Sequence, residues 1–143
     1  MKKLLFVAIV FSVVSFSVKA QCDKKITWTG AKADIVDASG NVERSLNEKI
    51  VFQLSAHDIK IVHGDREDDP LSGEVTKAAC NWTEKYRNGK TVLNARFTET
   101  SGDSMDGSVT VEGKDGHIII TLQMEGRNGT KIIRVPIDNY KEL

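Results

Sequence analysis

The sequence predicts an all-β domain, an antiparallel up-and-down meander of about eight strands that forms a small barrel or, alternatively, a two-sheet β-sandwich. Apolar and polar residues alternate along most of the chain, and no window after residue 20 keeps helical apolar spacing for three turns. Short turn sequences separate the alternating runs, which makes consecutive strands antiparallel neighbours. Barrel closure removes exposed strand edges, so we favour the barrel.

Four strands are predicted in the first half of the domain, at residues 26–36, 49–54, 59–63 and 73–86. Within the first, the apolar positions change face after Gly30, which predicts a bulge or a sharp bend. Residues 42–47 are only weakly patterned, and residues 64–70 read as a loop because of their charge density and Pro70. On the long fourth strand, one face is expected to carry Thr76, Ala78, Cys80 and Trp82.

The second half is predicted to contain strands at residues 90–98, 108–112, 117–125 and 130–137, with a polar loop at 100–107 and a tight turn at 113–116. Asn88-Gly89 and Asn128-Gly129 both predict type I′ hairpin turns, because such turns need positive φ at both central residues. Pro136 predicts a strand end or a sheet edge at that point.

Residues 1–20 have the features of a secretory signal peptide: Lys2 and Lys3, an apolar run, and small residues at positions 18 and 20. Residues 21–143 then form a single domain that is secreted or periplasmic. The apolar run is shorter than the roughly 20 residues that span a bilayer, so we expect no stable membrane insertion after cleavage. A lipoprotein is the alternative suggested by Cys22, although Gln21 stands where a small residue is needed.

Loss of the leader removes three of twenty basic residues and none of the twenty acidic ones, which gives the remaining chain a net charge of −3. This balance gives no reason to expect nucleic-acid binding, which needs a basic surface. Cys22 and Cys80 are the two cysteines, and in an exported chain they predict a disulfide. Free thiols or an intermolecular bridge are the alternatives.

No residue pattern indicates a catalytic site, so we expect a protein that is not an enzyme and has no cofactor. There is no G-x-S-x-G nucleophile motif and no glycine-rich phosphate loop. His57, His63 and His117 are expected at separate strand ends, which is unsuitable for a metal site. The acidic residues of 65–69 do not follow the calcium-loop spacing and are expected to form a solvated loop.

Several aromatic residues are expected on inward strand faces, and Trp28, Phe52, Trp82 and Phe97 are candidate ligand-binding residues. The alternative is that they simply fill the core, because eight-stranded barrels either fill with side chains or hold one small ligand. In size, export signal and strand number, the chain resembles small lipocalin-like barrels. The lipocalin G-x-W motif is incomplete, since Trp28 has no glycine two residues before it.

These observations favour an exported, non-enzymatic β-barrel that binds a small apolar ligand in its interior. The alternative is an extracytoplasmic interaction or inhibitor module that binds a protein partner through the exposed loops at 65–69 and 100–107.

Overall fold

The structure, a computed structural model, describes residues 24–143 and contains eleven β-strands and no helix within that range. The strands are β1 (Ile26–Gly30), β2 (Ala33–Val36), β3 (Val42–Leu46), β4 (Ile50–Leu54), β5 (Asp58–His63), β6 (Leu71–Glu84), β7 (Asn88–Thr98), β8 (Ser104–Lys114), β9 (His117–Gly126), β10 (Gly129–Pro136) and β11 (Asn139–Glu142). The predicted signal peptide and Cys22 lie outside the described residues. In the part of the chain that is described, no helix could cross a membrane.

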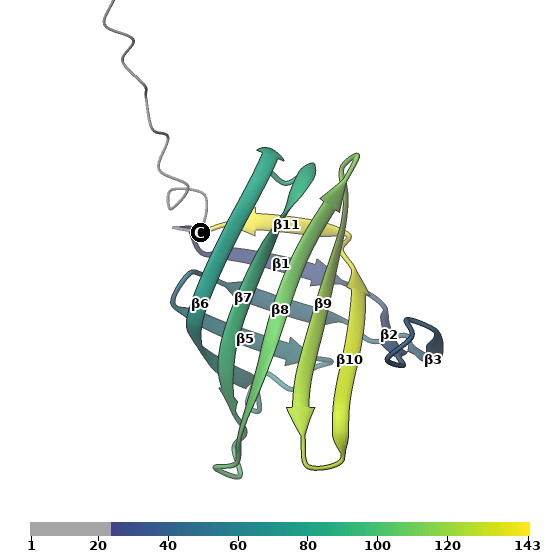
Figure 1. Ribbon diagram of the computed structural model, residues 1–143, viewed down its shortest axis with the longest axis vertical. Coiled ribbons are helices and arrows are strands. Elements are labelled where there is room, and N and C mark those ends of the chain that lie inside the picture. Colours follow the sequence, from purple (N-terminus) through teal and green to yellow (C-terminus); the bar gives the residue numbers. More distant parts are fainter. Residues whose placement is uncertain (1–23) are drawn as a thin grey trace, which may run out of the picture.

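All eleven strands belong to one antiparallel sheet, in the order β11-β1-β4-β5-β6-β7-β8-β9-β10-β2-β3. From β4 to β10 each strand pairs with the next in sequence, which confirms the up-and-down meander. The sheet curls so that β6 to β10 cross over β1, β4, β5 and β11 (Figure 1). It is therefore a single sheet rather than the two sheets of a sandwich, and its hydrogen-bonded ladder does not close on itself.

The short connection between β1 and β2 brings the two end regions of the curled sheet together. β1 and β2 are separated by only two residues, yet β1 pairs with β11 and β2 pairs with β10. At this corner the Asp138 amide donates to the Thr29 carbonyl at 2.9 Å, and the Ala31 amide donates to Asp138 Oδ2 at 2.9 Å.

Gly30 makes the predicted bend possible. A Cβ atom at this position would lie 2.5 Å from Val135 Cγ1 and 2.6 Å from the Pro136 carbonyl oxygen. Such distances are too short for non-bonded atoms, so only glycine lets β1 pass this close to the end of β10. The predicted strand at 26–36 is therefore divided into β1 and β2.

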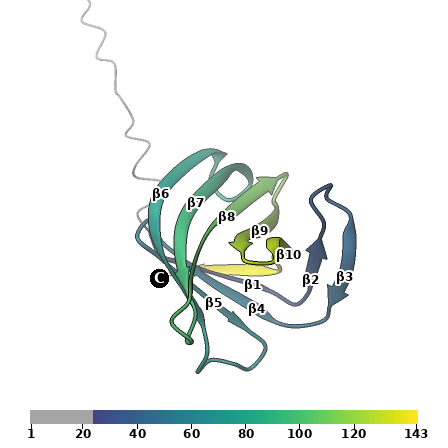
Figure 2. The same cartoon turned by 60° about the horizontal axis from the view of Figure 1, so that its bottom comes forward.

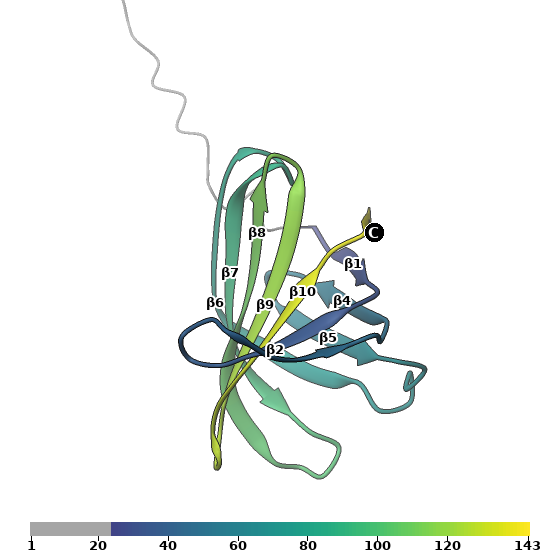
Figure 3. The same ribbon diagram turned by 90° about the vertical axis from the view of Figure 1, so that its right-hand side faces the viewer.

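Two short strands were not predicted. β3 has four exposed residues and one half-buried residue, so it lacks the apolar alternation by which a strand is recognised. It lies at an edge of the sheet, where the β2–β3 hairpin projects from the remainder of the fold (Figures 2 and 3). β11 is four residues long and is largely exposed.

Both Asn-Gly predictions were wrong, because neither pair forms the two central residues of its turn. Asn88 and Gly89 belong to β7, and residues 85–87 form the turn, with Tyr86 at a φ of 57°. Arg127-Asn128 is the two-residue loop before Gly129. The turn with positive φ at both central residues is Asp115-Gly116, which lies within the predicted tight turn and has φ values of 52° and 83°.

A register shift between Val75 and Lys77 divides β6 into two parts with opposite inward faces. Leu71 and Val75 are half-buried before the shift, and Cys80 and Trp82 are buried after it. Ala78 lies after the shift and shares the face of Cys80 and Trp82 as predicted, although it is exposed, whereas Thr76 lies at the shift itself and is separated from that face. The extra residue of the bulge reverses the alternation.

Apolar residues that alternate along the predicted strands form the core. Phe97, Val109, Ile120 and Val135 are fully buried, and each comes from a different strand of the β7–β10 layer. Ile59 and Ile61 of β5 and Phe52 of β4 pack in from the crossing layer. Pro136, which predicted a strand end or a sheet edge within residues 130–137, is the last residue of β10.

Candidate ligand-binding cavity

The interior contains a cavity of about 460 Å³ at one end of the curled sheet. Its apolar lining comes from both layers and comprises Ala33, Ile35, Leu46, Ile50, Phe52, Ile61, Pro70, Leu71, Leu122, Met124 and Ile133. Volumes of this size, with mainly apolar walls and a few polar groups, are typical of small-molecule sites.

Cross-strand pairing places these side chains beside one another. Phe52 pairs with Ile61, and Ile61 pairs in turn with Leu71, so one wall runs across β4, β5 and β6. Ile35 pairs with Ile133, which pairs with Leu122, so the facing wall runs across β2, β10 and β9. Directly paired residues in a sheet point to the same face, which explains why each row presents a continuous apolar surface.

Four aromatic side chains form a cluster at the other end of the interior, where Trp28, Trp82 and Tyr86 are buried and Tyr140 is 48% exposed. The ring of Tyr86 packs edge-on against Trp28, Trp82 and Tyr140, with centroid distances of 5.3, 5.7 and 5.1 Å. Edge-to-face contacts at these distances are favourable because the positive ring edge meets the negative ring face. Phe52 pairs with Trp28 and also lines the cavity, so it separates the aromatic cluster from the hollow part.

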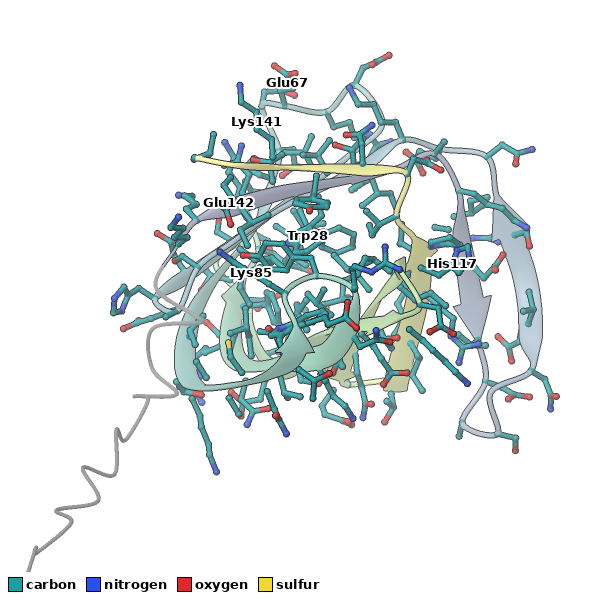
Figure 4. The ribbon with its side chains drawn as sticks, turned by 90° about the horizontal axis from the view of Figure 1, so that it is seen from above. Trp28, Glu67, Lys85, His117, Lys141 and Glu142 are labelled. Atoms are coloured by element: carbon teal, nitrogen blue, oxygen red, sulfur yellow. The ribbon has the colours of Figure 1, made fainter. Side chains whose placement is uncertain are left out.

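A charged group covers the aromatic end (Figure 4). Glu142 accepts from Lys85 Nζ at 2.8 Å and from Lys24 Nζ at 3.2 Å, and these two contacts lower the pKa of Glu142 to about 2. Lys85 Nζ also lies 5.1 Å from the centroid of the Tyr86 ring. Burial, with the Glu142 charge as a second cause, raises the pKa of Tyr86 above its usual range.

Polar residues surround the opening of the cavity. His63 Nδ1 lies 3.3 Å from Glu48 Oε1 on one side. The Thr100 hydroxyl donates to Asp69 Oδ1 at 2.7 Å and connects the β5–β6 loop to the β7–β8 loop. We call this set, with Arg44, Glu99, Ser101 and Lys131, the cavity rim.

Among the four predicted ligand-binding residues, Phe52 lines the cavity. Trp28 and Trp82 belong to the aromatic cluster, where Trp82 Nε1 donates to Thr91 Oγ1 at 2.8 Å. Trp28 also borders a second cavity of only about 30 Å³. Phe97 is fully buried in the core. Of the four predicted residues, Phe52 therefore lines the cavity and the other three do not.

Sequence reasoning missed the contributions of Arg44, Leu46 and Lys131. Arg44 and Leu46 lie two residues apart on β3 and share its inward face, but the strand itself was not recognised. Lys131 shares the inward parity of Ile133 and Val135 on the predicted strand 130–137. Extending that alternation by one step toward the loop would have placed Lys131 at the cavity.

The two loops predicted as interaction sites both reach the rim. Residues 64–70 form a loop as predicted, whereas the second loop is shorter than predicted because Ser104–Gly107 belong to β8. Within residues 24–143, no group of three or more His, Cys, Asp and Glu side chains is placed to hold a metal ion.

Cys80 is buried, and its sulfur lies 3.4 Å from Thr91 Oγ1. Its predicted partner, Cys22, lies outside the described residues, so the disulfide stays a prediction. Comparison of the chain with protein-family models, curated proteins and solved structures finds no match.

Proposed function

We propose that this protein binds one small apolar ligand in the cavity between the two layers of its sheet, without catalysing a reaction. The observation that supports the proposal is the cavity of about 460 Å³, walled by apolar side chains and ringed by polar ones. A hollow of this kind leaves apolar surface unpaired in the empty protein, and an apolar ligand would remove that surface from water.

The proposal makes a quantitative expectation for a homologous series of ligands. Burial of each methylene group contributes about 0.8 kcal/mol, which corresponds to roughly a fourfold change in affinity. Straight-chain alcohols of increasing length should therefore bind progressively tighter until the cavity is full. Further methylene groups would then remain in water and add little.

A fluorescence titration tests the site directly. N-phenyl-1-naphthylamine is a neutral apolar probe that brightens in an apolar environment, and we expect it to bind with one-to-one stoichiometry. The variant Ile133→Trp adds bulk to the cavity wall and should abolish binding. Ile119→Trp is the matched control, because Ile119 is 39% exposed on the outer face of the neighbouring strand β9.

Both variants must remain folded for this comparison. Circular dichroism and the midpoint of thermal unfolding test whether they do. Unchanged affinity in a folded Ile133→Trp protein would refute the cavity as the binding site. A wild-type protein that fails to bind the probe or any alcohol would refute the function itself.

The second candidate function is recognition of a protein partner through the loops at 64–70 and 99–103. The hydrogen bond between Thr100 and Asp69 supports this candidate, because it joins the loops into one surface. Replacement of both loops by short Gly-Ser turns, followed by capture from the culture medium or periplasm of the host, separates the two functions. Loss of a captured partner with retained probe binding would favour the interaction module.

Export is part of the proposal and rests on the leader pattern of residues 1–20. Intact-mass measurement of the protein isolated from its host tests it. A mass that corresponds to residues 21–143 is expected, whereas a mass that includes residues 1–20 would refute cleavage after Ala20.

A further inference from the structure

We propose that the cavity selects ligands whose apolar body carries one anionic group, and that Arg44 and Lys131 bind this group. The inference rests on the proposed function, since it names the chemical class of ligand for the same cavity. It follows from the positions of Arg44 and Lys131, from the apolar surface that lies between these two residues, and from the hydrogen-bond partners of the acidic rim residues.

Arg44 and Lys131 lie on the two strands that flank β2 at the cavity. Arg44 pairs with Ile35 across β3 and β2, and Ile35 pairs with Ile133 across β2 and β10. Lys131 lies two residues before Ile133 on the same inward face. Sheet spacings then put the two Cα atoms roughly 12 Å apart, a separation across which two long basic side chains can reach one small anion.

The acidic rim residues are already engaged by donors of their own. Glu48 is paired with His63, Asp69 accepts from Thr100, and Glu99 Oε2 lies 3.5 Å from the Ser101 hydroxyl. By contrast, neither Arg44 nor Lys131 has a carboxylate within 4 Å in the described part of the chain. The rim therefore has two cationic groups available for a ligand, while its carboxylates are partly satisfied.

The surface between the two cations is apolar. Ile35 and Ile133 occupy the paired positions that separate Arg44 from Lys131, and both line the cavity. A ligand whose apolar body rests on these isoleucines would place an anionic end group between the two basic side chains. A guanidinium group is suited to this because its planar donors match a carboxylate in two parallel hydrogen bonds.

A ligand series with one tail and three head groups tests the inference. Decanoate, decan-1-ol and decylammonium compete with N-phenyl-1-naphthylamine for the cavity at a pH where both ionic heads are charged. We expect decanoate to bind at least about tenfold tighter than decan-1-ol, because charge-assisted hydrogen bonds are the stronger ones. Decylammonium should bind most weakly.

The double variant Arg44→Gln/Lys131→Gln should remove the advantage of decanoate and leave the affinity for decan-1-ol unchanged. Lys60→Gln/Lys77→Gln is the matched control, since it removes two positive charges from exposed outward positions of β5 and β6. This control protein should retain the preference for decanoate, which separates local binding from a change in net charge.

The possible failures are distinguishable. Equal affinities for the three ligands, a preference for decylammonium, or a preference for decanoate that survives in the Arg44→Gln/Lys131→Gln protein would overturn the inference while the proposed function stands. Failure of the wild-type protein to bind the probe and all three ligands would overturn both.

Discussion

The hydroxyl of Thr100 and the carboxylate of Asp69 join two loops across the cavity opening, at a distance of 2.7 Å. The two residues are separated by 31 positions in the sequence. Because both loops contribute to the rim, this hydrogen bond links the width of the opening to the arrangement of two otherwise independent turns.

Replacement of Thr100 by valine should loosen the opening with little effect on global stability. The bond is exposed, so its loss should change the free energy of unfolding by less than about 1 kcal/mol. Amide exchange in residues 64–70 should become faster, as should dissociation of N-phenyl-1-naphthylamine in stopped-flow measurements. Thr83→Val removes a hydroxyl contact to the Asn88 carbonyl at the aromatic end and is the control. Identical kinetics in both variants would contradict a role of this bond at the opening.

Replacement of Gly89 by alanine should destabilise the protein strongly. A Cβ atom there would lie 2.5 Å from both the Asn81 carbonyl oxygen and Trp82 Cα, and Gly89 has a φ of 149°. We expect a loss of roughly 2–4 kcal/mol in a urea titration, since backbone strain and a core clash combine. Gly40→Ala is the control, because Gly40 also has positive φ but no atom within 4 Å of the new methyl group. The control should lose only about 1 kcal/mol.

Replacement of Cys80 by serine tests the predicted disulfide with Cys22. Closure of a loop of nearly sixty residues should contribute roughly 4 kcal/mol through the unfolded chain, so the serine variant should unfold at lower urea concentration. Reduction of the wild-type protein should abolish most of this difference. Alkylation with and without reductant, followed by intact-mass measurement, counts the free thiols. Two free thiols in protein isolated without reductant would show that no disulfide forms.

The contacts of Glu142 with Lys85 and Lys24 predict a dependence of stability on pH. The pKa of Glu142 falls from its ordinary value of 4.5 to about 2 in the folded protein. The stabilisation is therefore complete above pH 4.5 and is lost as the pH falls toward 2, since protonation then becomes easier in the unfolded chain. Carbon-13 NMR titration of the carboxyl group measures this directly.

Lys85→Met should move the pKa of Glu142 back toward 4.5, because it removes the larger of the two causes. Lys141→Met is the control, since Lys141 lies on the same short strand but forms no ion pair with Glu142 in the described structure. An unchanged pKa in the Lys85→Met protein would show that this contact does not hold the charge of Glu142.

Local sequence patterns were sufficient to predict every strand except β3 and β11, and the apolar alternation of most of them. Ile118, Ile120 and Leu122 alternate with less buried residues along β9, and the structure buries all three. The same holds for Leu93, Ala95 and Phe97 on β7. These predictions succeed because side chains on a strand alternate between the two faces of the sheet, so one buried face leaves a readable pattern.

The turn predictions show where local propensity is overridden. Asn88-Gly89 fits a type I′ turn by sequence, but Gly89 is needed beside Trp82, where a side chain has no room. Packing against the tryptophan therefore fixes the position of Gly89 in the strand, and Tyr86 adopts the left-handed conformation in the turn instead. In this conformation the Tyr86 ring packs against Trp28 and Trp82.

The sequence by itself determined an all-β meander, its core alternation and the bend at Gly30, because each depends on neighbours within a few residues. Only the tertiary structure decided that aromatic side chains cluster at one end of the interior while the other end stays hollow. It also decided that Arg44 and Lys131 lie on either side of the same apolar surface. These positions depend on which distant strands pair and in which register, and on a bulge in β6 that reverses an inward face. Pairings between strands far apart in sequence leave no short-range periodic signal from which they could have been read.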